Sequence, residues 1–96
     1  MSDYSFYLPA DFNDYEQEVT AKGFFAEAKI ICLEKTYSIH FYDPARLSQE
    51  IDDEIRHDAV FFESNLVIVS SVTGSAMAQA ADLLVRSGRM KFLASD

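Results

Sequence analysis

The sequence predicts an α+β domain made of two β-α-β halves, and an internal repeat is the strongest observation in favour of this class. The segment FYLPA, which starts at Phe6, recurs as FYDPA at Phe41, an offset of 35 positions. The longer segment FFAEAKIICLEKT, from Phe24, recurs as FFESNLVIVSSVT from Phe61, an offset of 37 positions. A period of this size is typical of one supersecondary unit that is used twice. The second observation is that strand-like and helix-like periodicities alternate along the chain.

The first half is predicted to be a strand, a helix and a strand. Apolar and polar side chains alternate over residues 4–8, which predicts a half-buried strand that Pro9 ends. Residues 11–22 carry apolar side chains at i, i+3 and i+7 with acids between them, as an amphipathic helix does. Gly23 is the predicted end of that helix, and the Ile-rich segment 27–33 predicts the second strand.

The second half repeats this order. Residues 34–36 are short enough for a hairpin connection, and residues 37–42 alternate again as a third strand. Asp43 followed by proline is typical of a helix start, so we expect a helix over about 43–57. Aliphatic side chains at four-residue spacing predict a buried stripe on this helix: Leu47, Ile51 and Ile55. The continuous apolar run 66–70 predicts a strand that is covered on both faces.

A third helix is predicted over residues 75–87, between a capping Thr73 or Ser75 and Gly88. Small side chains on one of its faces allow close approach to another element. The tail 89–93 is expected to add a short edge strand or to fray.

Two duplicated halves, at about residues 4–36 and 37–73, resemble the ferredoxin-like plait, in which two helices cover one face of a four-stranded antiparallel sheet. The resemblance places the first and third strands at the centre of the sheet and makes helix 75–87 an addition to the plait. It is an analogy of topology that implies no activity. We expect the whole chain, residues 1–96, to form a single domain.

The paired phenylalanines of the repeat are expected to point at the helices, so their neighbours must lie on the opposite face of the sheet. The residues of this predicted interaction face are Ser5, Tyr7, Ser38, His40 and Tyr42. In a two-layer fold the face is uncovered, and it is too apolar to stay bare. We expect a second copy of the chain, or the last helix, to cover it. Alternatively, Tyr7, His40 and Tyr42 hold a ligand, with His40 as the acid or base.

The formal charge of the chain is −8, and it is unevenly distributed. Through Ser64 there are 14 acids and 5 bases, and from Asn65 onward there are 2 acids and 3 bases, so the two parts carry −9 and +1. This charge disfavours nucleic acid as a partner and favours a basic protein. The candidate residues for contact with a basic protein lie on the second helix: Glu50, Asp52, Asp53, Glu54 and Asp58. A solvated helix face is the simpler interpretation of the same acids.

No motif assigns a reaction, a cofactor or a metal, so we expect no catalytic residues and none of these groups. Three glycines cannot form a nucleotide-binding loop, and the single Cys32 has no partner for a disulfide or a thiolate zinc site. Asp53 and His57 share a helix face, as metal ligands on a helix would, but a third ligand would have to come from elsewhere and no second His is near in sequence. No apolar run approaches the length of a membrane span and no signal peptide begins the chain, so we expect a cytoplasmic protein without membrane contact.

These observations predict a small acidic cytoplasmic domain that works by self-association, most simply as a homodimer, and that is not an enzyme. Two alternatives stay open. The acidic second helix also suits an inhibitor or immunity-type partner of a basic protein such as a nuclease. The open sheet face also suits a dimeric enzyme or small-ligand sensor that encloses a pocket there.

Overall fold

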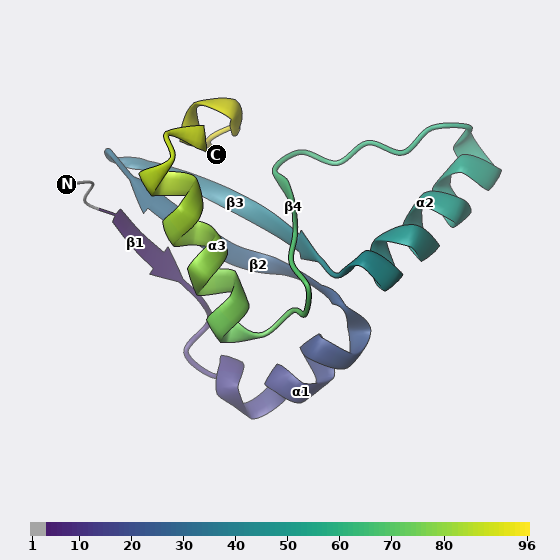
Figure 1. Ribbon diagram of the computed structural model, residues 1–96, viewed down its shortest axis with the longest axis horizontal. Coiled ribbons are helices and arrows are strands. Elements are labelled where there is room, and N and C mark those ends of the chain that lie inside the picture. The colour runs from purple at the N-terminus through teal and green to yellow at the C-terminus, as the bar shows by residue number, and fades with distance from the viewer. Residues whose placement is uncertain (1–3) are drawn as a thin grey trace.

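The computed structural model describes residues 4–96 and shows a four-stranded sheet with three α-helices (Figure 1). The elements are β1 (Tyr4–Tyr7), α1 (Phe12–Lys22), β2 (Phe24–Cys32), β3 (Lys35–Tyr42), α2 (Pro44–Asp58), β4 (Leu66–Ile68), α3 (Gly74–Arg86) and the 3-10 helix η1 (Arg89–Phe92). The predicted α+β class is confirmed. None of the helices formed by residues 4–96 combines the length and the apolarity that a bilayer-spanning helix needs.

The strands lie in the order β1-β2-β3-β4, with antiparallel pairing except between β3 and β4, which are parallel. The central strands are therefore β2 and β3, whereas the resemblance to the plait places the first and third strands there. The path of α1 explains the difference. Figure 1 shows α1 across the end of the sheet, below β1 and β2, so the chain re-enters beside β1 in the opposite direction. The α+β class stands, but this strand order does not establish the plait.

A tight hairpin joins the two central strands at Leu33 and Glu34, whose φ angles are 52° and 66°. Two consecutive positive φ values are typical of a type I′ turn, whose twist matches that of paired strands. The turn thus begins one residue earlier than the predicted connection at 34–36.

β2 also begins earlier than predicted, at Phe24 instead of residue 27, and its register with β3 shifts between Phe25 and Ala28. Such an irregularity is typical of a β-bulge.

The core lies between one face of the sheet and the two helices α1 and α3. The most buried side chains are Phe12 and Val19 of α1, Phe25, Ala28, Ile30, Ile39 and Phe41 of the sheet, Val72, and Met77 and Ala81 of α3. The paired phenylalanines of the repeat both face this core, as predicted. Their rings meet edge to face with centroids 6.4 Å apart, although Phe41 is completely buried and Phe6 only partly.

Polar contacts join α1 to the start of α3. The backbone N–H of Gly74 donates to Oε2 of Glu16 at 2.8 Å, and the hydroxyl of Thr20 donates to the carbonyl of Val72 at 2.8 Å. The hydroxyl of Thr73 caps α3 by accepting from the N–H of Ala76. These bonds fix α1 to the N-terminal end of α3 and the residue before its cap.

The second copy of the long repeat has a different structure from the first. The first copy begins with the continuous strand β2. The second copy begins inside an irregular segment, residues 59–65, which we call the connection, and continues into the short β4. β4 was expected to be covered on both faces over 66–70, but it is shorter and Ile68 is 52% exposed. The repeat therefore specifies the order of the elements without giving its two copies the same surroundings.

Helix α2 extends away from the sheet, beyond β4 (Figure 1). Its start is well specified, because the carboxylate of Asp43 accepts from the N–H of Arg46 at 2.7 Å and Pro44 occupies the first turn. None of its residues is buried, so the prediction of a buried stripe is wrong for a single chain: Leu47 and Ile51 are partly exposed and Ile55 is 51% exposed.

The tail after Gly88 forms η1 instead of the predicted edge strand or frayed end. Met90 and Leu93 pack against the core, and the side chain of Asn65 binds both the carbonyl and the N–H of Ala94. The tail thus covers the end of the sheet where the connection joins β4.

Candidate functional site

The predicted interaction face is divided between two strands that are not neighbours. Ser5 and Tyr7 lie on the edge strand β1, and β2 separates them from the three predicted residues of β3: Ser38, His40 and Tyr42. In the register of the sheet, Tyr7 lies opposite Lys29, which in turn lies opposite Ser38. Tyr7 is 46% exposed, whereas Tyr42 is only 4% exposed. The structure therefore brings His40 and Tyr42 together and leaves Tyr7 apart from them.

Tyr42 and His40 make a polar cluster with the connection. The hydroxyl of Tyr42 donates to Oε2 of Glu63 at 2.5 Å, and Oε1 of Glu63 lies 3.4 Å from Nδ1 of His40. The same Nδ1 lies 2.8 Å from the carbonyl oxygen of Ser64. The ring of Phe24 packs on Tyr42 with centroids 4.8 Å apart. These contacts hold the connection against β3 and cover the half of the sheet face that carries Tyr42.

The polar groups of this cluster bind one another within the chain. Burial, followed by the hydrogen bond and the charge of Glu63, raises the pKa of Tyr42, so the phenol stays a neutral donor at neutral pH. Neither His40 nor Tyr42 lines either of the two grooves on the body of the protein. Within residues 4–96, no group of three or more potential metal ligands comes together. His57 illustrates this, because its Nδ1 meets the backbone carbonyl of Asp53 and not its carboxylate.

Replacing Tyr42 by phenylalanine is expected to lower the free energy of unfolding by about 1.5 kcal/mol, since a hydrogen bond to a charged group is lost. The raised pKa adds a dependence on pH. A phenol whose pKa is higher in the folded chain stabilises the fold fully below about pH 10, the value in the unfolded chain, and loses this contribution as the pH rises further.

Urea denaturation at pH 8 and pH 11 measures both effects. The wild-type chain is expected to lose more stability between these pH values than Tyr42→Phe does. Tyr4 and Tyr15, whose pKa values burial also raises, remain in the variant and account for the residual loss. Equal losses in the two proteins would contradict the role given to the bond between Tyr42 and Glu63.

The acids predicted to contact a basic protein divide into two groups. Glu50 accepts from Arg46 at 2.8 Å, and the guanidinium of Arg46 lies over the ring of Phe24 at 5.5 Å from its centroid. This pair fixes the base of α2 to the body of the protein. The other four acids are exposed along the extended part of the helix: Asp52, Asp53, Glu54 and Asp58.

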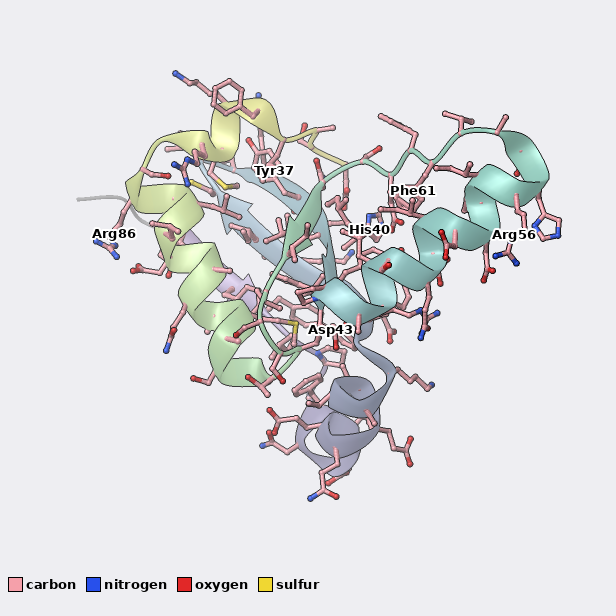
Figure 2. All side chains as sticks on the ribbon, turned by 45° about the vertical axis from the view of Figure 1, so that its right-hand side comes forward. Tyr37, His40, Asp43, Arg56, Phe61 and Arg86 are labelled. Atoms are coloured by element: carbon pink, nitrogen blue, oxygen red, sulfur yellow. The ribbon has the colours of Figure 1, made fainter. Side chains whose placement is uncertain are left out.

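An apolar surface accompanies these acids on α2 and the first part of the connection, residues 44–62, which we call the arm. Ile55, Val60 and Phe62 are 51%, 61% and 84% exposed, and they follow Leu47 and Ile51 of the stripe. Figure 2 shows Phe61 in the space between the connection and α2, and Arg56 on the outer side of the helix. Sequence reasoning missed Val60, Phe62 and Glu63, although the apolar run that follows a predicted helix end was a visible signal for the first two.

The hollows on the described part of the body include two shallow grooves of about 320 Å³ each. One lies between α1 and β2 and includes Tyr15, Lys22 and Glu27 in its lining. The other, which we call the α3 groove, lies between α3 and the chain that follows β4. It is lined by Val69, Ser70, Ala76, Gln79, Ala80 and Leu83.

Comparison with known proteins adds no relative. No protein-family model matches the chain, and neither a curated protein nor a solved structure is significantly similar to it.

Proposed function

We propose that this protein acts by association with another protein chain, without chemistry of its own, and that its first partner is a second copy of itself. The observation that carries this proposal is the apolar surface of the arm. Ile55, Val60 and Phe62 are more than half exposed in a single chain, and they continue the stripe of Leu47 and Ile51, which is partly exposed. The arm is the binding element.

The energetics of α2 support a partner. A helix of 15 residues is marginal in water by itself, and most helices owe their stability to packing of an apolar face. Here the first half of the helix is partly covered, with contacts of Arg46 and Glu50 at its base, whereas every residue from 52 to 58 is exposed. Full burial of one large aliphatic or aromatic side chain contributes about 1.5–3 kcal/mol, so covering Ile55, Val60 and Phe62 offers a substantial driving force. Exposed apolar surface of this kind is typical of an interface.

A second copy is favoured as the partner by size and charge. A domain of 96 residues buries a modest share of its surface alone, and homodimers are the commonest soluble oligomers. The chain also carries both an acidic part and a part of opposite sign, −9 through Ser64 and +1 after it. The interface proposed here differs from the predicted one, because contacts within the chain already occupy Tyr42 and His40.

Ile51→Glu tests the proposal, with Gln49→Glu as the matched control on the opposite side of the same helix. A carboxylate in the centre of the stripe would be buried without a partner in the dimer, so the dissociation constant is expected to rise at least about 100-fold. Sedimentation equilibrium over the micromolar range gives the molar mass, and circular dichroism checks that both variants stay folded. The control is expected to keep the dimer mass of the wild type.

If Ile51→Glu keeps the dimer mass, the arm is not the interface. A wild-type chain that stays monomeric at all concentrations would contradict self-association. In that case a basic protein becomes the better candidate partner, because the arm carries four exposed acids on the same helix as its apolar stripe.

A further inference from the structure

We propose that the arm of each chain binds in the α3 groove of a second copy, so that two chains exchange their arms reciprocally. This inference rests on the proposed function and names the receptor for the same arm. Three properties of the groove and the arm lead to it: their shapes, their charges and their positions on the molecule.

The shapes fit the packing of one helix on another. The stripe residues of α2 stand at i, i+4 and i+8 and form a ridge along the helix. On α3, Ala76 and Ala80 stand at i and i+4 and have the smallest side chains that line the groove, beside the half-exposed Leu83. A row of small side chains lets the ridge of another helix approach closely, which is how the commonest class of helix pairs forms.

The charges favour the α3 groove of the second copy, and not its arm, as the surface that receives the arm. Glu54 borders one edge of the stripe, Asp52 borders the other, and Asp58 lies in line with its C-terminal end, so two arms packed side by side would bring acids together. The C-terminal end of α3 and the following η1 instead carry the three bases Arg86, Arg89 and Lys91. Arg86 is 68% exposed at its side chain although it pairs with Asp82. An acidic arm is therefore attracted to the α3 side of a second copy.

The positions of the arm and the α3 groove on the molecule allow two chains to exchange arms in a closed dimer. Figure 1 shows β4 between α3 and α2, so the arm and the α3 groove lie near the same edge of the sheet. The arm extends away from its own α3, and none of its helical residues is buried within its own chain. A two-fold axis beside this edge would let each chain give one arm and receive one, which closes the assembly at two copies.

Mixed-chain crosslinking tests the arm exchange directly. One batch of protein carries Ile55→Cys in the arm, and a second carries Leu83→Cys in the groove. The native Cys32 is buried and serves as an internal reference for background reaction. On mixing and mild oxidation, a disulfide-linked dimer between the two variants is expected. Ala78→Cys is the matched control for the groove, because Ala78 is exposed on another side of the same helix, and it is expected to give no crosslink with Ile55→Cys.

Filling the groove is the second measurement. Ala80→Gln is expected to raise the dissociation constant of the dimer at least about tenfold, while Ala78→Gln leaves it unchanged. Glutamine favours helix nearly as well as alanine. Because Ala80 also packs against the core and Ala78 is exposed, urea denaturation of both variants measures any loss of stability separately from dissociation.

The outcomes separate this inference from the proposed function. If Ile51→Glu dissociates the dimer but Ala80→Gln does not, or if Ile55→Cys links mainly to itself, the arm exchange is overturned while self-association through the arm stands. If Ile51→Glu leaves the dimer intact, the proposed function fails together with the inference.

Discussion

Phe41→Ala is expected to lower the free energy of unfolding by about 3–5 kcal/mol, because it removes a completely buried ring from the centre of the core. The site cannot easily collapse around the cavity. Phe41 sits on the central strand β3, opposite Phe25 of β2 on one side and Val67 of β4 on the other. Folded domains of this size have total stabilities of about 5–15 kcal/mol, so the variant would approach global unfolding.

The repeat provides a matched control for this variant. Phe6 is the counterpart of Phe41 in the first copy of the repeat and meets it edge to face, but it is only partly buried on the edge strand β1. Phe6→Ala is therefore expected to lower the free energy of unfolding by clearly less than Phe41→Ala does. Urea denaturation followed by circular dichroism measures both losses. Equal losses would contradict the unequal surroundings that the structure gives to the two copies.

Gly23→Ala is expected to have the second large effect and to lower the free energy of unfolding by about 2–3 kcal/mol. Gly23 ends α1 with a φ of 73°, a left-handed conformation that costs a residue with a Cβ about 1–2 kcal/mol. A Cβ at this position would also lie 2.5 Å from Oδ2 of Asp43. Because Asp43 caps α2, its displacement adds the loss of a helix cap, about 1 kcal/mol.

Gly88→Ala isolates the conformational part of this cost. Gly88 has a φ of 75°, but nothing lies within 4 Å of the position that an added Cβ would occupy, so only the backbone strain of about 1–2 kcal/mol is expected. Urea denaturation gives the difference between the two variants, which reports the contact between Gly23 and Asp43. If both alanine variants lose the same stability, that contact does not hold the start of α2.

The candidate site was only partly predictable. The sequence placed Tyr42 and His40 on the face opposite the core, because side chains alternate along a strand. Their partner Glu63 lies 21 positions further along the chain than Tyr42, on an irregular connection that no periodicity describes. The acids of α2 were all placed on one helix in advance, but the contact of the Arg46 guanidinium with the ring of Phe24 joins positions 22 residues apart and depends on the tertiary structure.

By itself the sequence determined the α+β class and the approximate limits of most elements, because these depend on signals between near neighbours. Asp43 and Pro44 start α2, Gly23 ends α1, and alternation marks β1 and β3. Only the tertiary structure decided the strand order and the exposure of the α2 stripe. A strand of either half has the same pattern whichever neighbour it pairs with, and an amphipathic helix has the same stripe whether its own chain or another covers it.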